Sequence, residues 1–180
     1  MLENDLSDVK RRRITAAGAF SRGTCCLADL PSGILVQAAT FLSAPSKALF
    51  AIAIALDENL PNEKSSAIVD NQWDTLDFGE VEKQLAARLS DDDIEKMLLC
   101  IDAVNRVKKL KLTNCVKITG VGLEPLCGST IIEQIDLSLV PYHESPDLDS
   151  APPISCDDVL PILDSIISQE GCQLKHIQFP

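Results

Sequence analysis

The sequence has few aromatic residues, which make up only 4% of its 180 residues. A hydrophobic core must therefore be built from the aliphatic side chains that bring the hydrophobic fraction to 46%, and a base-stacking platform for single-stranded nucleic acid is disfavoured. Basic residues are also scarce, 16 against 27 acidic ones, for a net charge of −11. An acidic body repels phosphate backbones and anionic membrane surfaces. We therefore expect no nucleic acid and no membrane as a partner.

The chain also lacks the signals of secretion. Its N-terminus has no apolar signal core, no N-x-S/T acceptor site occurs, and none of the seven cysteines forms a C-x-x-C pair. Free thiols in a reducing compartment are the simplest interpretation, which predicts a cytoplasmic or nuclear protein, or both. The run Lys10–Arg13 could be a nuclear-import signal, but a solvated basic patch is the favoured interpretation.

Catalytic motifs are absent as well. The only histidines, His143 and His176, have no nucleophile motif nearby, and no P-loop, G-x-G-x-x-G, G-x-S-x-G or H-E-x-x-H sequence occurs. The acidic run Asp91–Asp93 could suggest a metal, but it follows Ser90 and is more typical of the first turn of a capped helix. We expect a protein that is not an enzyme, with no cofactor and no metal site.

One apolar stretch, residues 33–56, has about the length that a membrane span needs and a single charged residue. Polar residues and a proline interrupt its centre at Ser43–Lys47. Two short helices joined there are therefore favoured over a span. Leu30-Pro31 opens the first helix, since proline suits a helix start.

The strongest signal is a six-residue apolar pattern that occurs four times. In each copy the last two apolar residues alternate with polar ones, as a strand with one buried face requires. The connecting segments predict helices, with Thr119 and Ser155 as N-terminal caps. Parallel strands in chain order, near 76–78, 110–112, 135–137 and 177–179, are expected. The copies are Trp73-x-x-Leu76-x-Phe78, Val107-x-x-Leu110-x-Leu112, Ile132-x-x-Ile135-x-Leu137 and Leu174-x-x-Ile177-x-Phe179.

The block Cys115–Leu123, with the pattern C-x-x-I-T-x-x-G-L, resembles the cysteine-containing class of leucine-rich repeats. Residues 27–56, with Leu30-Pro31-x-x-Ile34-Leu35, look like the front of an F-box. The resemblance implies an α/β fold: a short leucine-rich-repeat solenoid with parallel strands and outer helices, preceded by a small helical F-box-like segment. It further implies a substrate-recognition subunit of an SCF-type ubiquitin ligase, with a Skp-type adaptor and a cullin scaffold as partners. The implied adaptor-binding residues are Leu30, Pro31, Ile34, Leu35, Ala38 and Leu42.

A second hypothesis is a repeat scaffold without a ligase role, in which residues 27–56 shield the end of the solenoid. Exposure distinguishes the two hypotheses. A docking surface leaves Leu30, Ile34 and Leu35 partly exposed, whereas a cap buries them against Trp73 and Leu76. No V-C-R-x-W-like sequence follows Phe50, as a complete F-box would require.

The polar residues between the buried strand residues should line the concave surface and hold an unknown target protein. Lys111 should lie across from Asp136. Such a row could be a recognition surface or a solvated, mutually neutralised face, and both interpretations stay open. The predicted target-binding residues are Thr75, Asp77, Lys109, Lys111, Thr113, Gln134, Asp136, Ser138, His176 and Gln178.

The expected organisation has three parts: a disordered tail at 1–26, F-box-like helices at 27–60, and repeats at 61–180. Residues 57–66 are expected to form a polar linker. The third repeat carries an acidic, proline-rich insertion at 139–153. Because the last strand has no helix after it, the chain could be a fragment of a longer array.

Overall fold

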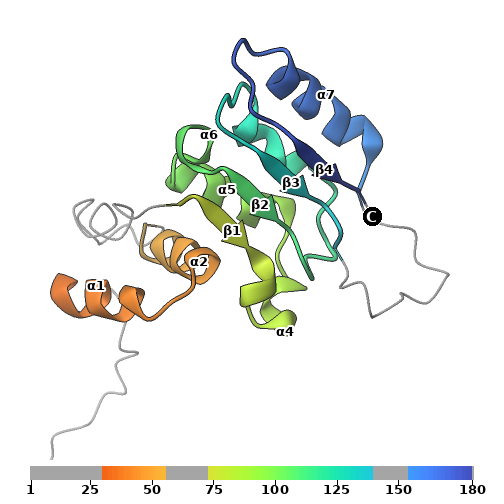
Figure 1. Ribbon diagram of the computed structural model, residues 1–180. Coiled ribbons are helices and arrows are strands. Elements are labelled where there is room, and N and C mark those ends of the chain that lie inside the picture. The colour runs from red at the N-terminus through yellow and green to blue at the C-terminus, as the bar shows by residue number, and fades with distance from the viewer. Residues whose placement is uncertain (1–29, 56–72, 140–153, 180) are drawn as a thin grey trace, which may run out of the picture.

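The computed structural model describes residues 30–55, 73–139 and 154–179 (Figure 1). The predicted tail 1–26, the linker 57–66, His143 and the insertion beyond Leu139 therefore lie outside the described residues. Helices and strands alternate along the chain. They are α1 Ser32–Thr40, α2 Ala44–Ala55, β1 Thr75–Asp77, η2 Phe78–Glu80, α4 Lys83–Ala86, α5 Asp91–Cys100, α6 Ala103–Arg106, β2 Lys109–Lys111, η3 Val121–Leu126, β3 Gln134–Asp136, α7 Cys156–Ile167 and β4 His176–Gln178.

The four strands form one parallel sheet in the order β1-β2-β3-β4. This arrangement confirms the expected parallel strands in chain order and places the chain in the α/β class. Each strand begins one residue earlier than predicted, so the third apolar residue of each copy lies just after the strand. The register aligns the second apolar residues: Leu76 pairs with Leu110, Leu110 with Ile135, and Ile135 with Ile177.

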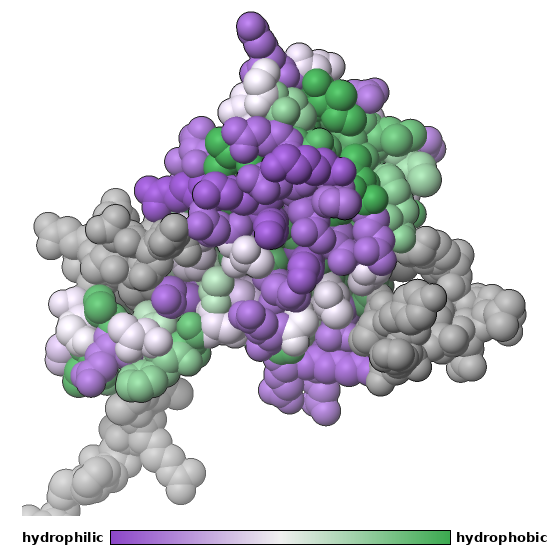
Figure 2. Space-filling model, in the orientation of Figure 1, coloured by the Kyte–Doolittle hydropathy of each residue, from purple (hydrophilic) through white to green (hydrophobic). Residues whose placement is uncertain are grey.

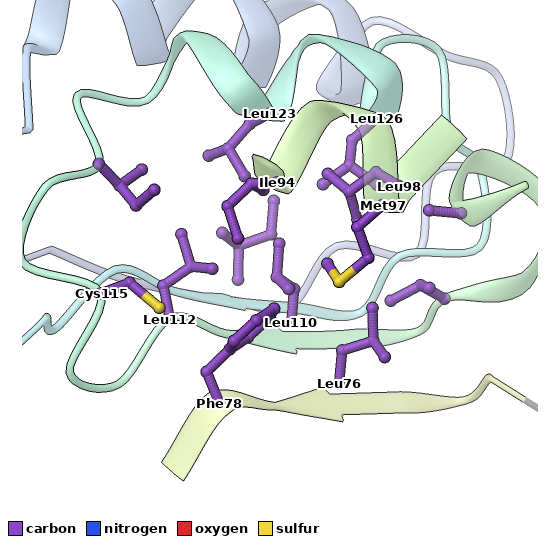
Figure 3. Packing of buried hydrophobic residues seen from close by; sticks show 14 of the residues in the cluster. Leu76, Phe78, Ile94, Met97, Leu98, Leu110, Leu112, Cys115, Leu123 and Leu126 are labelled. Atoms are coloured by element: carbon purple, nitrogen blue, oxygen red, sulfur yellow. The ribbon is translucent and has the colours of Figure 1, made fainter. Parts of the chain in front are cut away.

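The core lies between one face of the sheet and the helices. Figure 3 shows Leu76, Leu110 and Leu112 pointing from the strands toward Ile94 and Leu123 of α5 and η3. All five side chains are fully or almost fully buried. Full burial of an aliphatic side chain contributes about 1.5–3 kcal/mol, so the regular apolar pattern is the main source of stability. The opposite face of the sheet is hydrophilic where Figure 2 shows it.

Cys115 lies in the turn after β2 and is fully buried. Its thiol donates to the backbone carbonyl of Thr113, with 3.8 Å between Sγ and O. Burial raises the pKa of this thiol to about 12, so it stays neutral and serves as a small apolar residue.

The helix starts agree only in part with the predicted caps. Ser90 and Asp93 form a capping box at the start of α5, as predicted. The prediction that Thr119 caps a helix is wrong: Gly120 precedes a 3-10 helix, and the Thr119 hydroxyl donates to Asp91 instead. Ser155 lies at the N-cap position of α7, but its side chain makes no cap hydrogen bond.

The described part of the apolar stretch, residues 33–55, forms two helices, α1 and α2, with the break at Ser43, as predicted. The Ser43 hydroxyl donates to the Ser46 hydroxyl at 3.0 Å and the Ser43 carbonyl accepts from the Lys47 amide, so α2 starts immediately after it. Within the described ranges, no helix is long and apolar enough to cross a membrane. α2 packs against α5 and β1, with Ala48 in the same core cluster as Trp73.

Candidate protein-binding surfaces

The helix α1 exposes apolar side chains at the end of the molecule that lies beyond β1 (Figures 1 and 2). Pro31 precedes its first residue, and the Pro31 carbonyl accepts from the amides of Ile34 and Leu35. Ile34 is 51% exposed and Phe41 is 83% exposed. Exposed apolar side chains that gather on one short helix are typical of an interaction surface.

The structure brings most of the predicted adaptor-binding residues to this surface. Leu30, Pro31, Ile34 and Ala38 are exposed, and Leu42 is half-buried. Leu35, in contrast, is 1% exposed, so its side chain does not form part of a free docking face. The list of predicted residues also omitted Phe41, whose position seven residues after Ile34 places both on one side of a helix.

Leu35 is buried in a small cluster between α1 and α2, separate from the main core. Its neighbours there are Ala39, Ala51 and Ile54, with Cys100 of α5 partly buried against them. The cap hypothesis predicted burial of Leu30, Ile34 and Leu35 against Trp73 and Leu76. Only Leu35 is buried, and it packs on α2, so α2 covers the end of the sheet while α1 lies outside it.

The second candidate surface is the polar strand face, which we define as the predicted target-binding residues together with the residue before each strand. Thr75, Lys109, His176 and Gln178 are exposed. The other predicted residues of this face are half-buried, namely Asp77, Lys111, Thr113, Gln134, Asp136 and Ser138. The sheet register sets these residues in rows that run across neighbouring strands.

Lys111 lies across from Asp136 in the register, as predicted. Its ammonium group nevertheless pairs with Asp77 on the other side, at 2.9 Å from Nζ to Oδ2. The hydrogen bond to Asp77 and its charge raise the pKa of Lys111, and the Asp136 charge adds to the effect. Asp136 instead accepts hydrogen bonds from the amide (2.9 Å) and hydroxyl of Ser138. Lys111 thus lies between two carboxylates on adjacent strands.

A further row of charges, which was not predicted, lies one residue before each strand. Its members alternate in sign across the sheet, as Asp74, Lys108, Glu133 and Lys175. Lys108 pairs with Asp74 at 3.1 Å and Lys175 pairs with Glu133 at 3.5 Å. Aligning the four copies of the apolar pattern would have shown this alternation, because each of these residues stands two positions before the second apolar residue.

The role of Asp91 was not predicted from the sequence either. Its carboxylate accepts from the Thr119 amide and hydroxyl, both at 2.9 Å, from the Gly120 amide at 3.1 Å and from the Gly122 amide at 3.0 Å. Burial raises its pKa, but these hydrogen bonds together outweigh that effect and lower the pKa below its ordinary value. Asp91 therefore ties the start of α5 to the loop before η3.

The approach of these two segments is close. A Cβ atom on Gly122 would lie 2.4 Å from the carbonyl oxygen of Asp91, so only glycine fits there. Since both Asp91 and Asp93 are engaged in hydrogen bonds, the acidic run holds the fold together. Among the residues that the structure describes, no cluster of three or more His, Cys, Asp or Glu side chains could hold a metal ion.

Comparisons with models of known protein families, with curated proteins and with solved structures find no match to this chain. The candidate binding sites are therefore two surfaces with different chemistry: the apolar exposed side of α1 and the polar strand face.

Proposed function

We propose that this chain is a protein-binding adaptor, the substrate-recognition subunit of an SCF-type ubiquitin ligase. In this proposal α1 docks on a Skp-type adaptor that connects to a cullin scaffold, and the polar strand face holds the target protein. The observation that carries the proposal is the exposure of Ile34 on α1 and of Phe41 at its C-cap, while α1 itself is held in place by buried residues.

The arrangement of α1 and α2 suits docking. Leu35 fixes α1 on α2, and Ala48 fixes α2 on the main core. The apolar side chains of α1 are therefore presented from a rigid base, and little conformational entropy is lost when a partner covers them. A helix laid against an apolar groove of another protein is a recurring mode of recognition.

The repeat geometry supports a leucine-rich-repeat solenoid. Each copy of the apolar pattern contributes one short strand, neighbouring strands pair in parallel with equivalent residues side by side, and Cys115 is buried in the turn after its strand. In repeat proteins each unit contacts only its neighbours, and the accumulated strand face is the common binding surface.

The polar strand face fits a polar patch on a folded target. Its charges are mostly paired within the sheet, and it contains no aromatic anchor of the type that dominates many interfaces. Lys109 and Asp136 make no ion pair among the described residues, and of the two only Lys109 is exposed. An acidic side chain of the target placed over Lys109 would pair with its exposed ammonium group.

A second candidate is a repeat scaffold without a ligase role. It is favoured by the packing of α2 over β1, which shields the end of the sheet in the way that terminal repeats need. The two candidates differ only in whether the exposed side of α1 has a partner.

The test is co-expression of the chain with a Skp-type adaptor and a pull-down. Ile34→Asp combined with Pro31→Ala should abolish co-purification, because a charge buried in an apolar interface costs several kcal/mol. Leu160→Asp is a matched control, since Leu160 on α7 is 50% exposed and Ile34 is 51% exposed. The control should leave the complex intact, and circular dichroism should show both variants folded. Equal recovery of adaptor by the double variant and the wild type would contradict the ligase proposal and favour the scaffold.

A further inference from the structure

Among the described residues, β4 is the last strand of the sheet, and no described strand pairs with its outer side. Ile177 is 37% exposed, whereas the residues in the same row of the sheet, Leu76, Leu110 and Ile135, are buried. Phe179 is 40% exposed, whereas Leu137 at the same place after β3 is buried. Figure 2 shows hydrophobic surface on the side of the molecule where β4 and α7 lie. An edge strand with apolar neighbours presents backbone groups that another strand can use.

The backbone hydrogen bonds between neighbouring strands repeat across the sheet, and the repeat indicates how a further strand would pair with β4. The carbonyl of the residue before each strand accepts two amides from the next strand. Asp74 accepts from Lys108 and Lys109, Lys108 accepts from Glu133 and Gln134, and Glu133 accepts from Lys175 and His176. Lys175 holds the same position before β4, and no described residue donates to its carbonyl.

A second regularity concerns the residues that follow β2 and β3. The amide of Leu112 donates to Asp136 at 3.0 Å, and the amide of Leu137 donates to Gln178 at 2.8 Å. Phe179 is the corresponding residue after β4, and its amide has no acceptor among the described residues. By analogy with the inner strands, the Lys175 carbonyl and the Phe179 amide are thus placed to pair with a further parallel strand.

The charges specify the residue that a further strand should carry. Lys108 has Asp74 on one side and Glu133 on the other, and Lys111 lies between Asp77 and Asp136. Lys175 has Glu133 on one side only. An acidic residue beside Lys175 would continue the alternation of charge across the sheet.

We infer that the β4 edge binds an extended segment of a partner protein as a fifth parallel strand, with an acidic residue beside Lys175 and apolar residues beside Ile177 and Phe179. This surface is separate from α1, and the inference does not depend on the ligase proposal. Main-chain hydrogen bonds would supply the affinity and the alternate side chains the specificity, as in other cases of strand addition.

A second copy of this chain fits the edge poorly. Pairing β4 with β4 would bring basic strands together without an acidic residue opposite Lys175. The acidic strand β1 has the required sequence, but α2 packs against it and occupies that end of the sheet. The partner is therefore expected to be a different protein that carries an acidic, alternately apolar segment.

The probe is a synthetic peptide of residues 132–138, Ile-Glu-Gln-Ile-Asp-Leu-Ser, because β3 follows the basic strand β2 in the way that the partner would follow β4. The peptide is titrated into the ¹⁵N-labelled full chain and followed by NMR. Shifts should be confined to β4 and its neighbours. The same peptide carrying Glu133→Lys should bind about fivefold more weakly, as expected for one partly exposed ion pair. Lys175→Glu in the protein should reverse that preference.

Two substitutions at one residue test the hydrogen bond. Phe179→Ala removes the ring and keeps the amide, whereas Phe179→Pro removes both. Phe179→Pro should weaken peptide binding more than Phe179→Ala, and the melting temperature reports whether each variant folds. Absence of binding, binding indifferent to the Lys175→Glu exchange, or equal effects of the two Phe179 variants would overturn the inference. So would concentration-dependent dimerisation that Phe179→Pro abolishes, because the occupant would then be a second copy.

Discussion

The two ends of the sheet carry the same apolar pattern and have opposite surroundings. At the first end Trp73, Leu76 and Phe78 are fully buried, with α2 packed over β1. At the last end Ile177 and Phe179 are more than one third exposed. The pattern therefore sets which side chains face the helices, while a neighbouring element decides how much of that face is removed from water. Four changes would break or sharpen this comparison.

The largest effect is expected at the closed end. Leu76→Ala should lower the free energy of unfolding by about 3 kcal/mol, because a fully buried leucine leaves a cavity. Ile177→Ala, the equivalent change at the open end, should cost roughly 1 kcal/mol, because the side chain already contacts water. Urea denaturation of both variants measures the difference. Equal losses of unfolding free energy in the two variants would show that Leu76 and Ile177 are equally buried.

The second change concerns the tie between α5 and the loop before η3. Asp91→Ala should destabilise the chain by about 2 kcal/mol, since several backbone donors lose their acceptor. The matched control is Cys156→Ala, at the first position of α7, which is exposed and should change stability by less than about 0.5 kcal/mol. A small effect of Asp91→Ala would mean that water replaces the carboxylate without loss.

The same carboxylate predicts a pH dependence. Because the pKa of Asp91 is lower in the folded chain than its ordinary value of 3.8, the folded state is stabilised above that value. The stabilisation is lost as the pH falls through the lower folded pKa. The midpoints of urea denaturation of the wild type and Asp91→Asn should therefore differ most at neutral pH. They should converge as the pH falls below 4.

The third change tests the close approach at Gly122. Gly122→Ala should cost roughly 1–3 kcal/mol, because the new methyl group meets backbone atoms of Asp91 that cannot move aside. Gly33 in α1 has open space around it. Gly33→Ala should instead stabilise the helix by about 0.5–1 kcal/mol. Thermal unfolding should show shifts of opposite sign.

The smallest effect is expected on the polar strand face. Lys111→Met removes the pair with Asp77 and should cost less than about 1 kcal/mol, since such pairs are partly solvated. Lys109→Met, on the same strand but without an ion pair, should have almost no effect on stability. If the polar strand face binds the target, Lys109→Met should weaken target binding while leaving the free energy of unfolding almost unchanged. Denaturation and binding assays on both variants separate the two roles.

The strands could be predicted because they depend on local periodicity, as the burial of Leu76 and Leu110 confirms. The role of Asp91 could not, because its partners lie 28 to 31 residues away in the sequence. The failed prediction for Thr119 has the same origin: a hydroxyl that could cap its own helix donates to a distant carboxylate instead. The exposure of Ile34 and the burial of Leu35 depend on how α1 packs on α2, which a single-helix pattern does not determine.

The packing of α2 over β1 also suggests an order in which the strands would detach under force. Each strand pairs only with its neighbours, and among the described elements α2 packs against β1 at one end of the sheet. Under a force applied to the two ends of the chain, β4 should detach first, because it is held by one strand and few buried side chains. β3 and β2 should follow in turn, so that the protein unravels from its last strand toward α2.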